Sequence, residues 1–129
     1  MKKVISTENA PKAIGPYSQA ILNGDTLFCS GQIAIVPKSG EIEGKNIAEQ
    51  TYQVMKNISG VLSAAEMTFA DVVKTTCFLT DIKDFAEFNK IYGEFFVSKP
   101  ARSCVVVAAL PKNALVEIEV IANHCDVKD

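Results

Sequence analysis

The feature that most constrains the fold is a long amphipathic segment at residues 46–65. Apolar side chains recur there at alternating spacings of three and four, which places them on one face of an α-helix. Asn46 precedes the pattern and Glu49 follows three positions later, as in a helix-capping pair. The apolar face consists of Ile47, Thr51, Val54, Ile58, Val61 and Ala65, widened by Met55 and Leu62. A helix with one apolar face needs a second layer to cover it.

A second helix is predicted to begin at Asp84. Glu87 occupies the capping-box position three residues later, where a glutamate can accept a hydrogen bond from the capping residue's N–H group. Pro100 stops any continuation of this helix, because proline lacks the N–H donor that a helix interior needs. The apolar face consists of Phe85, Phe88, Tyr92 and Phe95, with Ile91 and Phe96 beside it.

The N-terminal third is expected to form short strands. Asn23-Gly24 supplies the positive φ angles of a tight turn and therefore predicts a β-hairpin within residues 16–31. The turn residues at 37–40 end a third strand. The predicted strands are Tyr17–Leu22, Thr26–Ser30 and Gln32–Val36, followed by a loop at Glu41–Lys45.

Three further strands are predicted in the rest of the chain. Val72–Asp81 is rich in β-branched and aromatic residues. Ser103–Leu110 is a nearly continuous apolar run, typical of a strand buried on both faces. Val116–Val120 alternates strictly, as a strand with one covered face does. The order is therefore β-β-β-α-β-α-β-β, and the predicted fold class is α+β, a two-layer domain with two helices on one face of a mixed sheet.

Length and charge limit the classes of function. With 129 residues, the chain is expected to form one domain spanning residues 1–129. A formal charge of −2 provides no basic field for nucleic acid, so nucleic-acid binding is not expected. No apolar run approaches the roughly 20 residues of a membrane helix, and the N-terminus lacks the apolar core of a signal peptide. A cytoplasmic location is the resulting expectation.

Cysteine and histidine are scarce and poorly spaced for metal binding. The four cysteines form no Cys-x-x-Cys pair, so we expect thiols in the core or lining a site rather than disulfides. His124 lacks the spacing of a His–Cys zinc site, and no metal site is predicted. The chain also carries no Ser-His-Asp set and no glycine-rich phosphate loop. The cysteines are Cys29, Cys77, Cys104 and Cys125.

Arg102 is the single arginine and the first candidate for a functional residue. It precedes eight uncharged residues, where a cation is costly unless it meets an anion. One interpretation is a salt bridge to Glu117 or Glu119 on an adjacent strand. The other is a substrate carboxylate, which a guanidinium holds through two parallel hydrogen bonds.

Several polar residues are weaker candidates. Glu117 and Glu119 share one strand face, where they are either solvated or close to Arg102 across the last β-hairpin. A carboxylate beside a bound substrate can hold a water molecule and move a proton. Gly31 interrupts a strand, which indicates a bulge or a close approach of the backbone to a ligand. Tyr17 offers an apolar ring with a polar tip.

Taken together, the motifs resemble the RidA family, also called YjgF or L-PSP. The resemblance runs through nearly the whole chain in order, and the segment around Arg102 is highly specific. The motifs are Asn9-Ala10-Pro11, Ala13-Ile14-Gly15-Pro16-Tyr17-Ser18-Gln19-Ala20, Ser30-Gly31-Gln32-Ile33, Asp71-Val72-Val73-Lys74-Thr75-Thr76, Asp84-Phe85-Ala86 with Asn89, Pro100-Ala101-Arg102-Ser103-Cys104-Val105, Leu110-Pro111-Lys112 and Val116-Glu117-Ile118-Glu119.

The resemblance implies a chorismate-mutase-like fold and a homotrimer with ligand clefts between subunits. It implies hydrolysis of reactive enamines and imines, such as 2-aminoacrylate, to a 2-keto acid and ammonia. Such intermediates leak from pyridoxal-phosphate-dependent dehydratases, while the family itself needs no cofactor. By position, Arg102 would bind the substrate carboxylate and Glu117 would activate water. The cleft would be lined by Tyr17, Ser30, Gly31, Phe85, Asn89 and Cys104.

Two departures from the family pattern concern the edge of the cleft. The connection Val97-Ser98-Lys99 is shorter than is usual in the family, and Val106 and Ala109 are apolar where relatives often carry polar residues. These differences bear on substrate preference rather than on the presumed catalytic residues.

Two other functions compete with imine hydrolysis. A ribonuclease or translation inhibitor is also attributed to this family, although the negative charge and the absence of an aromatic-basic strip disfavour it. A non-catalytic trimer that binds a small carboxylate would use the same Arg102. Acceleration of keto acid release from a dehydratase reaction distinguishes catalysis from binding.

Overall fold

The computed structural model describes residues 2–124. Six strands form the main sheet in the order β1-β2-β3-β8-β6-β7, and β4 and β5 form a separate two-stranded sheet. Short 3₁₀ turns lie at Phe69–Asp71, Ile82–Asp84 and Pro111–Asn113. The strands and helices are β1 (Lys2–Ile5), β2 (Ala20–Asn23), β3 (Thr26–Cys29), β4 (Ile35–Val36), β5 (Glu41–Ile42), α1 (Ile47–Ala64), β6 (Val72–Leu79), α2 (Phe85–Phe95), β7 (Ala101–Val106) and β8 (Val116–Asn123).

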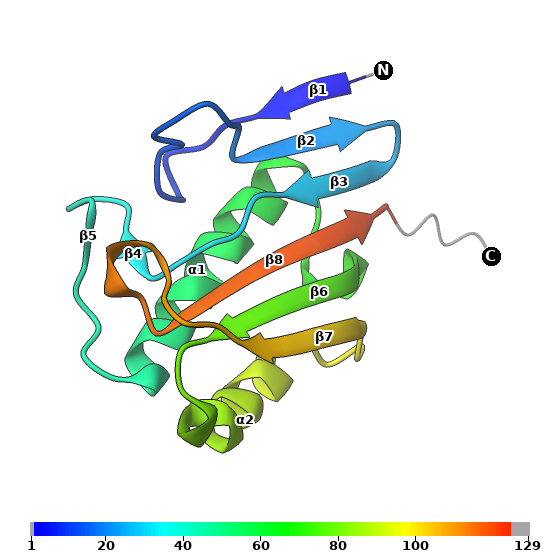
Figure 1. The fold of residues 1–129 in the computed structure, drawn as a ribbon. Coiled ribbons are helices and arrows are strands. Elements are labelled where there is room, and N and C mark those ends of the chain that lie inside the picture. Colours follow the sequence, from blue (N-terminus) through cyan, green and yellow to red (C-terminus); the bar gives the residue numbers. More distant parts are fainter. Residues whose placement is uncertain (1, 125–129) are drawn as a thin grey trace.

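Both helices lie against one face of the main sheet (Figure 1). The central strand β6 pairs in parallel with β7 and antiparallel with β8, so the sheet is mixed. Every second side chain of β6 and β8 points into the helical layer and is buried, as Cys77, Ile118 and Val120 show. The predicted α+β fold, with two helices on one face of a mixed sheet, is confirmed.

The cap predicted for the first helix is confirmed, whereas the cap predicted for the second is wrong. The Asn46 side-chain oxygen accepts a hydrogen bond from the Glu49 amide at 2.9 Å, and the Glu49 carboxylate accepts one from the Lys45 amide at 2.7 Å. Asp84 makes no side-chain capping hydrogen bond. Asp81 instead caps the preceding 3₁₀ turn by accepting from the Lys83 amide at 2.9 Å. The chain turns before Asp84, so Asp84 already has helical dihedral angles.

The β2–β3 hairpin is confirmed, but three other N-terminal predictions need correction. Strand β1 is absent from the prediction, because its four residues, two of them lysines, are too few to show a period. The expected strand Gln32–Val36 is reduced to β4, with Gln32 forming an isolated bridge to Ile118. The predicted loop Glu41–Lys45 contains β5, which pairs with β4. Two-residue strands are too short for a period to identify them.

The largest correction concerns the apolar run Ser103–Leu110. It was predicted as a strand buried on both faces, but β7 ends at Val106 and lies at the edge of the sheet. Only β6 pairs with it, and five of its six residues are exposed, among them Val105 and Val106. An apolar sequence indicates a strand that favours burial, but it does not show whether this burial comes from the same chain or from another copy.

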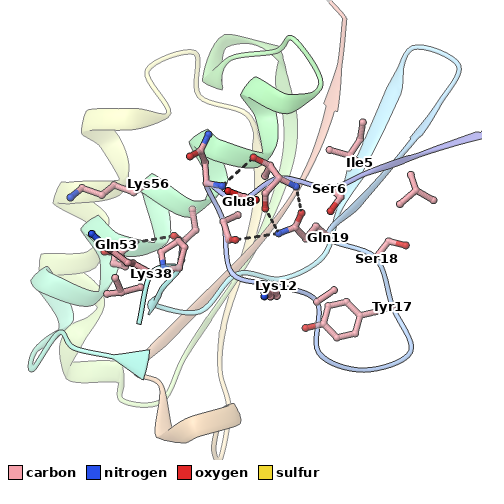
Figure 2. Close-up of a pocket in the computed structure, with 18 residues that line it drawn as sticks. Ile5, Ser6, Glu8, Lys12, Tyr17, Ser18, Gln19, Lys38, Gln53 and Lys56 are labelled. Atoms are coloured by element: carbon pink, nitrogen blue, oxygen red, sulfur yellow. Dashed lines mark hydrogen bonds between the residues drawn. The ribbon is translucent and has the colours of Figure 1, made fainter. Parts of the chain in front are cut away.

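Gln19 holds the N-terminal segment in place. Its side-chain oxygen accepts a hydrogen bond from the Thr7 amide at 2.7 Å, and its nitrogen donates to the carbonyls of Thr7 and Ala10 at 3.0 and 3.3 Å (Figure 2). The same nitrogen also donates to the Pro11 carbonyl at 2.7 Å. The side chain is 5% exposed. The same segment packs closely on α1, where a Cβ added to Gly60 would overlap the Asn9 carbonyl.

We therefore predict that Gln19→Leu destabilises the protein by about 2–4 kcal/mol, because it removes these bonds and leaves buried backbone groups unpaired. Urea unfolding monitored by circular dichroism measures the loss. Lys56→Ala, on an exposed position of α1, is the control and should stay within about 0.5 kcal/mol of the wild type. Equal stability of the two variants would contradict the role of Gln19.

Candidate active site

The residues predicted for the site fall into two separate groups. We name them the arginine pocket, formed at α2 and β7 around Arg102, and the carboxylate pocket, formed on the other side of the sheet around Glu117. Their cavities measure about 520 and 480 Å³. Phe85, Asn89, Cys104 and Arg102 belong to the first group, and Tyr17, Ser30, Gly31 and Glu117 to the second.

In the arginine pocket the guanidinium of Arg102 is held on two sides. Its Nη1 donates a hydrogen bond to Asn89 Oδ1 at 2.6 Å. Its central carbon lies 4.8 Å from the centre of the Tyr92 ring and 5.8 Å from the centre of the Phe85 ring. Because a guanidinium has five N–H donors, this arrangement orients the group and leaves donors for an anion.

Tyr92 is itself held in place by contacts with the core. Its hydroxyl lies 2.7 Å from Thr75 Oγ1, and Thr75 is fully buried directly beside Arg102 in the β6–β7 register. Tyr92 also packs on Phe96 with ring centroids 4.5 Å apart. Burial raises the pKa of the Tyr92 hydroxyl, so it stays protonated. The sequence places Tyr92 only on the apolar face of a helix. The spacing of residues along a helix cannot show that an arginine from a distant strand stacks on its ring.

In the carboxylate pocket the backbone at Gly31 leaves room for Glu117. A Cβ added to Gly31 would fall on the Glu117 carboxylate, within 2.8 Å of its carbon. The next residue, Gln32, pairs with Ile118 through two backbone hydrogen bonds of 2.8 and 3.1 Å, which fixes Gly31 against the sheet. The backbone at Gly31 is therefore closely approached by a side chain of the protein, and the expected approach to a ligand stays a prediction.

Ser30 and Tyr17 complete the wall of this pocket. The Ser30 hydroxyl donates to the Ser18 carbonyl at 2.6 Å, and the Ser30 amide donates to the Gln19 carbonyl at 2.9 Å. Tyr17 is 54% exposed and lies between this pocket and a larger cavity of about 1240 Å³. That larger cavity, drawn in Figure 2, contains only Tyr17 of the predicted site residues.

Glu117 is the acidic residue of this pocket whose pKa is shifted. Partial burial raises the pKa of its carboxyl group, and the negative charge of Glu119 raises it further. Glu119 lines the same pocket but is exposed. A carboxylate whose pKa is raised is a better proton acceptor than a free one.

The described cysteines behave as the sequence predicted. Cys29 and Cys77 are free and buried, and burial raises the pKa of each thiol to about 12. Burial also raises the pKa of Cys104, against a smaller opposing effect of Arg102. None of these three thiols is activated as a nucleophile. Cys125 lies outside the described residues.

The predicted pairing of Arg102 with Glu117 or Glu119 is wrong within one chain. Strand β6 lies between β7 and β8, so the last two strands do not form a hairpin. Arg102 points toward α2, whereas Glu117 points to the opposite face, which the helices leave open. Among the described residues, the only salt bridge joins Lys112 and Glu41 at 3.8 Å.

Residues 2–124 contain neither a metal-binding cluster nor a membrane-spanning helix. No group of three or more histidine, cysteine or acidic side chains is placed to hold a metal ion. No helix in the same range is both long and apolar enough to cross a bilayer.

Comparison with known proteins identifies the relatives of this chain. The family model described as Endoribonuclease L-PSP matches residues 7–124. The human 2-iminobutanoate/2-iminopropanoate deaminase is 49% identical over 123 residues, which are 95% of this chain and 90% of the human protein. A Rid family protein of Yersinia pestis has a TM-score of 0.92 at 53% identity, covering 95% of this chain and 99% of its own. E. coli TdcF, solved with bound serine, has a TM-score of 0.91 at 42% identity, with coverage of 95% and 99%.

These matches extend over nearly the whole described chain, and the predicted resemblance is confirmed. The chain belongs to the Endoribonuclease L-PSP family, also known as the Rid or YjgF family.

Proposed function

We propose that the protein is an imine deaminase that hydrolyses 2-iminopropanoate, 2-iminobutanoate and related enamines to 2-keto acids and ammonia. The observation that carries the proposal is the oriented Arg102 guanidinium, held by Asn89 and Tyr92 with donors left for a carboxylate. A lone, stacked arginine in a small pocket suits a small carboxylic acid. The activity named for the human relative and the serine bound to TdcF agree with this ligand class.

Hydrolysis of an imine needs few catalytic groups from the protein. Arg102 would hold the substrate carboxylate while Glu117 accepts a proton from water as the water attacks the imine carbon. The carbon–nitrogen bond then breaks, releasing ammonia and leaving the keto acid. Orientation and electrostatics supply the catalysis, since the iminium carbon is already electrophilic. No cofactor is required, and pyridoxal-phosphate-dependent dehydratases in the cytoplasm are the proposed source of substrate.

The positions of Arg102 and Glu117 require two copies of the chain in one site. The two residues lie on opposite faces, two strands and three residues apart in register, which is about 14 Å between Cα atoms. One substrate therefore meets Arg102 of one subunit and Glu117 of the next. We propose a homotrimer with three such clefts, since a head-to-tail contact repeats the same cleft at every interface and forms a ring when its rotation closes.

The open face of the sheet supports this assembly. It carries the apolar side chains of Phe28 and Val105, which are 46% and 47% exposed in the single chain. Val105 belongs to the edge strand β7, whereas Phe28 lies on β3, three strands away in the sheet. Exposed apolar side chains on a strand with an unpaired edge are typical of an interface.

Ribonuclease activity is the alternative that the family description names. The face of the single arginine is already stacked on Tyr92, and the chain carries a net charge of −2. Phosphate contacts need clustered cations and RNA binding needs free aromatic surfaces. Cleavage of a single-stranded RNA that persists in Arg102→Lys would favour a separate ribonuclease site.

Arg102→Lys is predicted to remove most of the deaminase activity without unfolding the protein. Lysine keeps the charge but loses the bidentate geometry and the flat surface that stacks on Tyr92, so kcat/KM should fall about 10- to 100-fold. Ammonia release from 2-iminobutanoate measures the activity, and circular dichroism checks the fold. Activity close to that of the wild type would remove Arg102 from its proposed role.

Glu117→Gln is predicted to lower kcat about 100-fold while leaving affinity for an unreactive carboxylate nearly unchanged, since the amide cannot accept a proton. Glu119→Gln is the matched control, with little effect at neutral pH. In this control the acid limb of the pH–rate profile should move to lower pH, because the negative charge that raises the pKa of Glu117 is gone.

Calorimetry with butyrate and ammonia release between pH 4 and 8 measure both glutamate variants. A larger loss in Glu119→Gln, or equal losses of binding and turnover in Glu117→Gln, would contradict the assignment.

The assembly is predicted to be a closed trimer in solution. Multi-angle light scattering at micromolar concentration should give three times the 13.9 kDa mass of one chain. Val105→Asp places a charge on the open face and should shift the mass toward that of the monomer, with loss of activity. A monodisperse, active monomer would contradict both the assembly and the shared site.

A further inference from the structure

The arginine pocket contains a second cation that carboxylate binding by Arg102 does not explain. Lys99 lines the same cavity of about 520 Å³, and none of the residues around the cavity is acidic. Neither cation forms a salt bridge with any described residue. The pocket therefore carries two positive charges in a molecule whose net charge is −2.

Lys99 has a backbone conformation that turns usually give to glycine or asparagine. Its φ angle is 57°, in the left-handed region where glycine or asparagine is less strained. The Lys99 amide donates to the Phe96 carbonyl at 3.0 Å, which closes the turn after α2. Pro100 follows and leads directly into β7, so the turn is rigid at both ends. This turn places Lys99 at the edge of the cavity that Arg102 also lines.

The spacing of the two cations suits a ligand with two acidic groups. Lys99 precedes Arg102 by three positions, which limits the distance between their Cα atoms to about 10 Å. Between them, Phe96 provides an apolar floor, and the 73% exposed Val97 provides an apolar rim. A Cβ at Gly93 would meet nothing within 4 Å, so α2 leaves the space above it open. A chain of two or three methylene groups fits such a surface, with one carboxylate at each cation.

We propose that Lys99 extends the arginine pocket into a site for two carboxylates, so that the protein prefers imines of 2-oxo dicarboxylic acids. The inference rests on the proposed function, since Arg102 holds the carboxylate next to the imine carbon in both cases. Lys99 binds the distal carboxylate. The imine carbon stays exposed toward the second subunit, which supplies Glu117.

The reaction is the same balanced hydrolysis. One water molecule adds to the imine carbon, the carbon–nitrogen bond breaks, and the products are ammonia and a 2-oxo dicarboxylate. Lys99 takes no part in bond making or breaking. Its contribution is binding energy that a monocarboxylate cannot use.

The test compares two imines, 2-iminoglutarate and 2-iminopropanoate. Amino-acid oxidases generate them in the assay from glutamate and alanine, and semicarbazide traps the imine that remains. The wild-type protein should show the higher kcat/KM for 2-iminoglutarate. Lys99→Gln should lower that value about fivefold, as expected for a solvent-exposed ion pair, and leave 2-iminopropanoate within about twofold. Raising the salt concentration should reduce the wild-type preference.

Lys112→Gln is the matched control. Lys112 also has a left-handed φ angle, 56°, but lies outside the pocket and pairs with Glu41. Its substitution should leave the ratio of the two substrates unchanged. Equal kcat/KM values for both imines in the wild type, or equal losses for both in Lys99→Gln, would overturn the inference.

A binding measurement separates this inference from the proposed function. Calorimetry with the unreactive acids glutarate and butyrate should show tighter glutarate binding in the wild type and no such difference in Lys99→Gln. If the protein accelerates the hydrolysis of neither imine over the rate without protein, the proposed function fails. A preference for glutarate over butyrate would still support the two-carboxylate site in that case. If glutarate and butyrate bind alike in the wild type, the two-carboxylate site is refuted even when both imines are hydrolysed.

Discussion

The hydrogen-bonded ladders on both sides of β6 determine where every functional group lies. Strand β6 pairs in parallel with β7 and antiparallel with β8. In these registers Thr75 lies opposite both Arg102 and Val120. Since paired residues in neighbouring strands point to the same face, this register directs Arg102 toward α2. The same register directs Glu117 to the open face, where it lies beside Phe78. A one-residue slip would exchange these directions and separate both side chains from their pockets.

The arginine pocket connects the core to the surface through one short chain of contacts. Thr75 is buried and bonded to the Tyr92 hydroxyl, and the Tyr92 ring carries the Arg102 guanidinium. A buried hydroxyl pair is costly to break, so the ring has little freedom to turn. The flexible arginine side chain therefore meets a rigid surface, which lowers the entropy lost when a ligand binds. Packing in the core thus fixes the surface on which the Arg102 guanidinium lies.

The proposed assembly and the proposed chemistry involve the same surface. An edge strand with exposed apolar side chains is a liability for a free monomer, because it can pair with other chains. Here β7 carries Arg102 on one side and Val105 on the other, so covering this strand would bring a second subunit close to the arginine pocket. The Glu117 carboxylate, on the open face, is then the group that a neighbouring copy can contribute.

The sequence by itself determined the two helices, the β2–β3 hairpin, the alternation in β8 and the identity of the candidate residues, because period and turn chemistry are local properties. It could not place β7 at the sheet edge or separate Arg102 from Glu117. Those outcomes depend on which strands pair, and pairing joins residues far apart in the chain. The stacking of Arg102 on Tyr92 and the anchoring by Gln19 likewise arise only when distant segments meet. Tertiary structure therefore decided how the candidate residues divide between two pockets.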